Sequence, residues 1–314
     1  MMRTTKRFAV ILAWISISSL SSAQSAGTSP SLKLTFTTYD APGALVTAIG
    51  DINSSGEMVG YYAFQSVGAA TGFTLKSGQL TSFSYESSST FGNGLNDAGV
   101  VAGYALVGNA YVGFTYDGSK FTIISPPGKT VTWIYGVSES GVVVGGTGVG
   151  IPNEAFESIS GQFRDTTPPP GGFIEASGAG INKYGEVAGF TTGAGTLGFM
   201  YSQGRFRILE VPGDNTVTEA WDINDNHIVV GFYQASCASG CKYHGFALRN
   251  GKYLTIDYPG AVNTFILGVD NAGELVGAYD YNSADHATHG FYTSPLTLAD
   301  FERPGCCRVD PNWK

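Results

Sequence analysis

Four acidic side chains lie in or just before a short turn motif that recurs along the chain: Asp51, Glu219, Asp222 and Asp270. If the repeats surround a common axis, these carboxylates lie nearest to it. Two carboxylic acids facing each other across about 5 to 9.5 Å would suit a glycosidase. The chain has no sialidase-type box, Gly-x-Ser-x-Gly elbow or His-Glu-x-x-His motif. A polysaccharide-active hydrolase or lyase is therefore an alternative, and isolated acids of turns and rims are the simpler interpretation.

The segment 51–56 resembles the start of a calcium loop, because its sequence follows Asp-x-Asn-x-Ser-Gly. The twelfth position of such a loop, which should hold a bidentate Glu, is Tyr62 here. In four other repeats the position of Asp51 is glycine, and Asp222 is the other exception. A turn explains the pattern in every repeat, so we expect no calcium.

A zinc site could draw on two equivalent loops, 237–244 and 285–289, which hold Cys237, Cys241 and His244 in one and Asp285, His286 and His289 in the other. In an exported chain the cysteines are expected to be oxidised instead. The disulfide candidates are Cys237, Cys241, Cys306 and Cys307. A bond within the first pair would close a loop, and a bond from that loop to the last pair would fix the C-terminal tail. We expect neither a metal nor another cofactor.

Aromatic side chains vary at two positions of the recurring motif. Five residues before the turn residue the chain has Ala48, Phe91, Trp133, Ser177, Glu219 and Phe265. Three residues before it the chain has Gly50, Asn93, Tyr135, Ala179, Trp221 and Leu267. Alternation along a strand puts both positions on one face. The predicted ligand-binding residues are Phe91, Trp133, Tyr135, Trp221 and Phe265, which could stack on a sugar or contact a peptide. The alternative is that these large side chains only fill an irregular channel or a gap between blades.

These residues are set in a repeat of the form apolar-Asn-x-x-Gly-x-x-x-Gly. It begins at Ile52, Leu95, Val137, Ile181, Ile223 and Val269. The last Gly of the motif recurs about every 42 to 46 residues, a period typical of propeller blades. A Gly-Phe pair follows each motif, with Ala155 replacing the glycine once. The phenylalanines are Phe73, Phe114, Phe156, Phe199, Phe246 and Phe291.

One repeat contains four short β-rich runs, which predicts a four-stranded antiparallel meander. Asn53 opens the tightest turn and Gly56 closes it, since Asn can cap its own turn and Gly accepts left-handed dihedrals. Small residues before the Asn place this strand innermost. The Phe of the third strand should pack between neighbouring blades.

The outer strands leave one ambiguity. Six inner three-strand sets face seven outer-strand candidates, because both 34–40 and 296–301 fit the pattern. We expect the N-terminal strand to pair with the strand of Phe291 and to close the ring, with the C-terminal tail lying over it.

The N-terminus indicates export. Arg3, Lys6 and Arg7 precede an apolar stretch that ends in the small residues 21–23, as in a secretory signal peptide. The net charge of −8 would become more negative on its removal, and no basic stripe is present. Nucleic acid and anionic membranes are therefore poor partners. The low charged fraction of 13% and the 44 glycines suit short strands and tight turns.

The motif, followed by His-Gly-Phe at 244–246 and 289–291 and by the Pro-Gly-Ala of 259–261, resembles the bacterial extracellular HAF repeat family. The resemblance covers roughly 34–294 and implies an exported propeller without an established reaction. The first four repeats depart from it, because other residues replace the His. These are Thr71, Val112, Glu154 and Leu197.

The sequence thus predicts an all-β, six-bladed β-propeller of four-stranded antiparallel blades, with a seven-bladed propeller or an open β-repeat array as alternatives. We expect a signal peptide at 1–23, a linker at 24–32, the propeller at 33–294 and a C-terminal strand with a cysteine-containing tail at 295–314. The expected function is that of a secreted, extracellular or periplasmic monomer that binds a glycan or a protein, with no membrane insertion.

Overall fold

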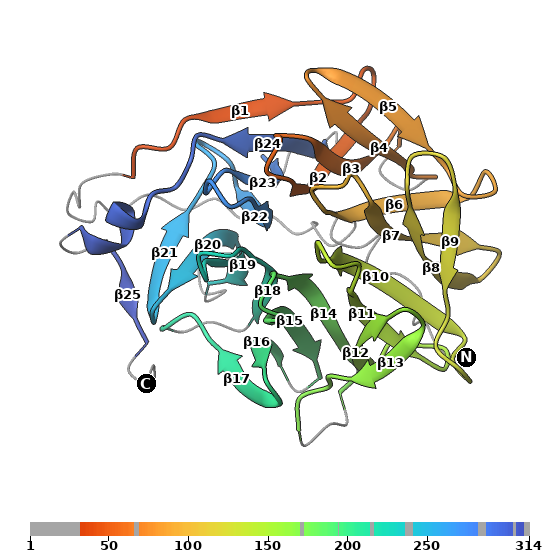
Figure 1. Ribbon diagram of the computed structural model, residues 1–314. Coiled ribbons are helices and arrows are strands. Elements are labelled where there is room, and N and C mark those ends of the chain that lie inside the picture. Colours follow the sequence, from red (N-terminus) through yellow and green to blue (C-terminus); the bar gives the residue numbers. More distant parts are fainter. Residues whose placement is uncertain are drawn as a thin grey trace.

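The computed structural model describes residues 32–65, 69–169, 173–193, 195–213, 217–235, 241–281, 287–303 and 306–310. The predicted signal peptide lies outside these residues. The strands of the six repeats are arranged around a common centre (Figure 1). Among the described residues, no helix is long and apolar enough to cross a membrane. The first strand of each repeat lies innermost. These strands are β2 (Val46–Ile52), β6 (Ser89–Leu95), β10 (Val131–Val137), β14 (Glu175–Ile181), β18 (Val217–Ile223) and β22 (Asn263–Val269).

The remaining strands follow in order outward. Second are β3 (Met58–Ala63), β7 (Val101–Val107), β11 (Val143–Gly148), β15 (Val187–Thr192), β19 (Val229–Gln234) and β23 (Leu275–Asp280). Third are β4 (Thr71–Lys76), β8 (Ala110–Tyr116), β12 (Glu154–Ile159), β16 (Thr196–Ser202), β20 (Tyr243–Arg249) and β24 (His289–Thr293). Fourth are β5 (Gln79–Phe83), β9 (Phe121–Ile124), β13 (Gln162–Asp165), β17 (Arg205–Leu209), β21 (Lys252–Ile256) and, for the sixth repeat, β1 (Phe36–Tyr39).

The all-β propeller is confirmed, but its division into six separate four-stranded blades is not. Four sheets of four strands are separate, and they hold repeats one, two, three and six. Repeats four and five share one nine-stranded sheet, because Thr196 of β16 pairs in parallel with Val217 of β18 and β25 (Arg308–Val309) adds to its far edge. The described strands form neither a seventh blade nor an open array.

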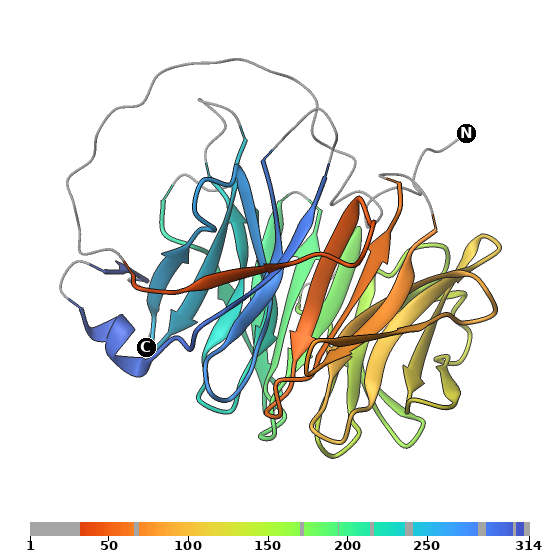
Figure 2. The same cartoon turned by 90° about the horizontal axis from the view of Figure 1, so that it is seen from above.

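The N-terminal strand closes the ring, as expected. β1 runs antiparallel to β24 with Thr38 opposite Phe291. It lies next to that strand in Figure 1 and passes in front of the blue strands in Figure 2. The amide of Thr47 in repeat one also donates to the carbonyl of Thr288 in repeat six at 2.9 Å. His289 reinforces the closure, since its Nδ1 lies 2.9 Å from a carboxylate oxygen of Asp40.

The last Gly of each motif is required by a close approach of backbone. Gly103 on β7 lies opposite Phe114, the Phe of the Gly-Phe pair. A Cβ on Gly103 would lie 2.1 Å from the carbonyl oxygen of Phe91 and 2.8 Å from the Phe114 ring. Phe114 itself is fully buried, and so is its counterpart in each repeat to within 3%. Each of the six also belongs to a buried cluster with residues of two neighbouring repeats, so the predicted packing between repeats is confirmed.

The turn Asn has a second role that its repetition alone does not reveal. The side-chain oxygen of Asn96 accepts the amide of Val100 at 2.9 Å, which is the expected cap of its own turn. Its Nδ2 also donates to the carbonyl of Ser138, the corresponding residue of the next repeat, at 3.2 Å. Equivalent bonds are made by Asn53, Asn182 and Asn224. The turns of neighbouring repeats are thus joined near the axis.

Asn96→Ser is expected to lower the free energy of unfolding by about 1 kcal/mol, because serine can keep the turn but cannot reach the next repeat. Ser138 shows that serine still caps this turn, since its hydroxyl accepts the amide of Val142 at 3.1 Å. Urea denaturation measures the change. The reciprocal variant Ser138→Asn should gain stability by restoring the missing donor, and a loss in that variant would contradict this role.

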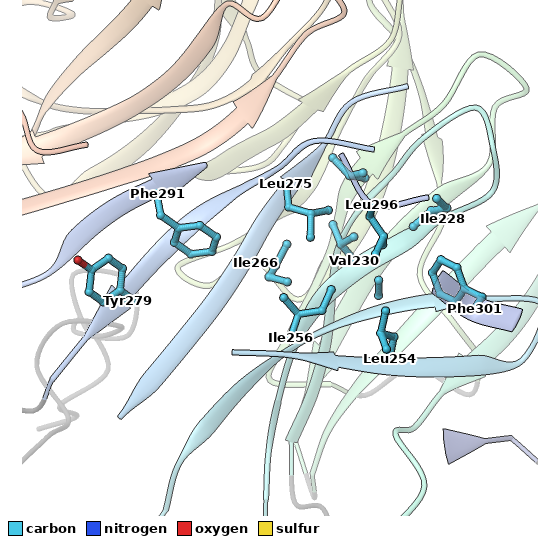
Figure 3. Close-up of a cluster of buried hydrophobic side chains, with 12 residues drawn as sticks. Ile228, Val230, Leu254, Ile256, Ile266, Leu275, Tyr279, Phe291, Leu296 and Phe301 are labelled. Atoms are coloured by element: carbon cyan, nitrogen blue, oxygen red, sulfur yellow. The ribbon is translucent and has the colours of Figure 1, made fainter. Parts of the chain in front are cut away.

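The C-terminal segment departs from the predicted strand. Residues 296–301 were expected to form a C-terminal strand, but this region contains the short 3₁₀ helix η2 (Leu298–Glu302). The edge of β24 is already taken by β1, and Asp300 accepts bonds from both the amide and the hydroxyl of Thr297, which favours a helical turn. Phe301 of η2 is buried in the cluster between repeats five and six (Figure 3).

Candidate functional site

A cavity runs along the axis and encloses about 1210 Å³ of empty space, including the part open to solvent. Every repeat lines it with the residue three before its turn residue, the residue one before it and the residue one after it. The cavity therefore extends from the Asn turns inward, to an aromatic cluster at the other end. A cavity of this kind, concave and partly aromatic with a few polar groups, is what small-ligand sites share.

A β-bulge in each inner strand decides which side chains reach the cavity. In β18 the register shifts between Ala220 and Asp222, so Trp221 is the additional residue. Trp221 and Asp222 are adjacent in sequence, and both line the cavity. Strict alternation would have put them on opposite faces. The bulge recurs in all six inner strands.

The five predicted aromatic residues belong to one buried cluster, but they do not share one role. Tyr135, Trp221 and Phe265 line the cavity. Phe91 and Trp133 are not part of the lining; Phe91 stacks on Tyr104, and Trp133 packs edge-on against Tyr111. Phe91 and Trp133 therefore fit the alternative of side chains that only fill space, and Tyr135, Trp221 and Phe265 are the ones that a ligand in the cavity could contact.

Two cavity-lining tyrosines were missed from the sequence. Tyr61 on β3 and Tyr104 on β7 each follow the last Gly of their motif directly, and both line the cavity. Phe190 and Phe232 occupy the same position in repeats four and five and belong to the same cluster. A large aromatic at this position in four of six repeats was the signal that could have found them.

Asp51 and Asp222 line the cavity from repeats one and five. Each carboxylate accepts the amide of the next residue and an amide of the following repeat, which is Leu95 for Asp51 and Val269 for Asp222, both at 2.8 Å. Burial and the negative charge of Asp222 raise the pKa of Asp51 well above its usual range. Burial raises the pKa of Asp222 to about 6.

The other two predicted acids differ in their positions. Asp270 lines the cavity, and burial raises its pKa. Glu219 is not part of the lining but lies beside the aromatic cluster, where Nε1 of Trp221 donates to it at 3.0 Å. Burial, opposed by this bond and aided by nearby Glu175, raises the pKa of Glu219 to about 8.

The residues after the turn Asn form a polar ring at the open end. The amide of Asp97 donates to Glu139 of the next repeat at 2.8 Å, and the amide of Lys183 donates to Asp225 at 3.0 Å. The ammonium of Lys183 also lies 3.2 Å from the Asp225 carboxylate. The entrance is thus predominantly acidic.

The proposed metal ligands have other partners. Both oxygens of Asp51 accept backbone amides, and Oδ1 of Asn53 accepts those of Ser55 and Glu57, so the segment forms a capped turn. No three His, Cys, Asp or Glu side chains within the described ranges are arranged to hold a metal ion.

The histidines considered for a zinc site, His244 and His289, make contacts within the fold. Nδ1 of His244 lies 3.0 Å from Asp257, and its ring stacks on Tyr233. His289 makes the same kind of contacts with Asp40 and Tyr279. Asp285 and His286 lie outside the described residues.

Cys241, Cys306 and Cys307 are disulfide-bonded, but the predicted alternative of a bond from the loop to the C-terminal tail is wrong. Cys306 is bonded to its neighbour Cys307, so neither cysteine is available to the loop. Cys241 is also disulfide-bonded, which excludes it as a zinc thiolate, and Cys237 lies outside the described residues. The adjacent pair packs against Phe301 and its cluster.

Comparison with known proteins gives a similar fold only. No family model and no curated protein match the chain. A virginiamycin B lyase from Staphylococcus aureus is 9% identical, with 78% of this chain and 79% of that chain covered and a TM-score of 0.46. A gluconolactonase from Xanthomonas campestris is 11% identical, with 80% and 89% covered and a TM-score of 0.47. The β-propeller domain of the Trilobed protease from Pyrococcus furiosus is 11% identical, with 78% and 82% covered and a TM-score of 0.41.

Proposed function

We propose that the protein is an exported, monomeric binding module whose axial cavity holds an extracellular ligand, with the six repeats acting as six blades around it. The resemblance to HAF repeats and the N-terminal sequence support export. The observation that carries the proposal is the cavity itself, which five repeats line with aromatic side chains and the same five repeats line with carboxylates. Rings and carboxylates arranged in this way suit a sugar unit of a glycan, or a short side chain of a protein.

Trp221→Ala is expected to weaken ligand binding at least tenfold, because the indole supplies a flat face of the cavity wall. A glycan array identifies the ligand, and isothermal titration calorimetry measures the affinity. Trp133→Ala is the matched control, since it removes the same side chain from the same cluster at a place that does not line the cavity. Equal losses in the two variants would mean that the rings only support the fold.

A second candidate function is a polysaccharide-active hydrolase or lyase. The raised pKa values of Asp51 and Asp222, two acids in one cavity, favour it, since a catalytic acid needs a pKa near the working pH. Asp222→Asn should then abolish the formation of product from the glycan, while binding of the glycan remains measurable. Binding of the same glycan without any product in the unaltered protein would reject the catalytic function.

A further inference from the structure

The charges around the cavity have one predominant sign. Its lining contains one basic side chain, Lys183, which is paired with Asp225. The acidic side chains of the lining are Asp51, Asp97, Glu139, Asp222, Asp225 and Asp270. A concave site with walls of one charge attracts ligands of the opposite charge. An anionic sugar or a phosphate would instead meet several carboxylates and no unpaired cation within the described lining.

Asp51 and Asp222 keep acceptor capacity after their backbone bonds are counted. Each of their four carboxylate oxygens accepts one amide. An ionised carboxylate has about four lone-pair sites, so about two remain on each group. The two groups also repel each other, which contributes to the raised pKa of Asp51. A cation at this level of the cavity would relieve that repulsion and form charge-assisted hydrogen bonds.

Two tyrosine hydroxyls give an independent indication of a ligand. Tyr104 is 2% exposed and lines the cavity, and its hydroxyl has no hydrogen-bond partner among the described residues. Tyr61 lines the same cavity and likewise has no such partner in the described chain. Burial raises the pKa of Tyr61 to about 12, so its hydroxyl stays protonated. Both tyrosines lie at the wall of the cavity, so a polar group of a ligand could form hydrogen bonds with their hydroxyls.

We propose that the ligand of this cavity carries a protonated primary amine, which pairs with Asp51 and Asp222 while the body of the ligand lies against Tyr135, Trp221 and Phe265. The inference rests on the proposed binding function and adds the chemical class of the ligand. Aromatic faces attract both cations and the apolar faces of sugar rings. An amino sugar combines the two, and its hydroxyls can pair with Tyr61 and Tyr104.

Calorimetric titration of the full chain with two pairs of probes tests the proposal. Glucosamine is compared with N-acetylglucosamine, and cadaverine with 1,5-pentanediol, so that each pair differs in the charged amine. We expect glucosamine to bind at least tenfold more tightly than its neutral partner. In another outcome, cadaverine binds more tightly than the diol while glucosamine binds no more tightly than N-acetylglucosamine. That result would support a charged amine and identify the ligand as an aliphatic amine instead of an amino sugar. Equal binding within both pairs, or no binding by either amine, overturns the proposal.

Three variants locate the amine. Asp222→Asn is expected to weaken glucosamine binding about tenfold and to leave the weak binding of N-acetylglucosamine unchanged. Tyr104→Phe should weaken binding a few-fold without loss of thermal stability, because the hydroxyl has no described partner to lose. Glu86→Gln removes the same charge as Asp222→Asn from an exposed loop and should change nothing.

Failure of the amine proposal and failure of the binding function give different results. If neutral sugars bind as well as charged ones and Trp221→Ala abolishes both, the cavity is a binding site and the amine is wrong. If no probe and no arrayed glycan binds, both proposals fall. An unchanged glucosamine affinity in Asp222→Asn, with binding lost in Trp221→Ala, would place the amine elsewhere and contradict the assignment.

Discussion

Gly103→Ala is expected to destabilise the protein by more than about 4 kcal/mol and to leave little soluble, folded chain. The added methyl group would lie 2.1 Å from the carbonyl oxygen of Phe91, a backbone atom that the bulge of β6 brings against β7. Moving that carbonyl would break the pairing of the inner strand. Soluble yield and urea denaturation measure the effect.

Gly99→Ala is the control, in the turn of the same repeat. A Cβ on Gly99 would meet nothing within 4 Å, so the substitution has only the conformational cost of a positive φ, about 1 to 2 kcal/mol. His227 occupies the corresponding position of repeat five with φ 59°, which shows that a side chain fits there. Similar losses in Gly99→Ala and Gly103→Ala would show that close approach is not what selects the last Gly.

Glu219→Gln is expected to stabilise the protein at pH 8.5 by on the order of 3 kcal/mol and to change little at pH 4.5. The pKa of Glu219 is about 8 in the folded protein, against an ordinary value of 4.5 for a glutamate. Between these values the folded state holds the proton more tightly than the unfolded chain does. The contribution of Glu219 to stability therefore falls as pH rises from about 4.5 to 8. Glutamine cannot ionise and can still accept the Trp221 N–H.

Urea denaturation of both proteins at the two pH values tests this expectation. Glu302→Gln is the matched control, because its side chain is 68% exposed and carries the same charge. It should leave the pH dependence of stability unchanged. A Glu219→Gln variant that is less stable than the parent at pH 8.5 would show that the ionised carboxylate is needed where it lies.

Much of the fold was predictable because local chemistry sets it. Asn53 and Gly56 specify a turn whatever surrounds them, and Phe73 on the third strand needs burial in any arrangement of these repeats. The closing role of β1 followed from counting strands. The junction of repeats four and five did not, since one pairing of Thr196 with Val217 depends on how two loops meet in space. The helical turn at 298–302 was missed because the apolar pattern of a strand was given more weight than the bonds that Asp300 accepts from Thr297.

The site was predictable only in part, because alternation along a strand was taken as unbroken. Tyr135, Trp221 and Phe265 were placed correctly along the axis by their positions in the repeat. The bulge adds the next position to the same wall, which is how Asp222 joins Trp221. No local residue pattern marks that bulge, since the last Gly that accommodates it lies on the neighbouring strand.

The bond between His289 and Asp40 joins residues 249 positions apart, and the whole of β1 depends on the strand that contains His289. A chain emerging from the ribosome therefore makes every other repeat before the partner of its first strand exists. Until then, the backbone groups of β1 have no partner strand, and the sides of repeats one and six that face each other are exposed to solvent. Pairing of β1 with β24 joins the most distant parts of the sequence, and contacts of this kind form slowly. Once it has formed, unfolding from either end of the chain must break it.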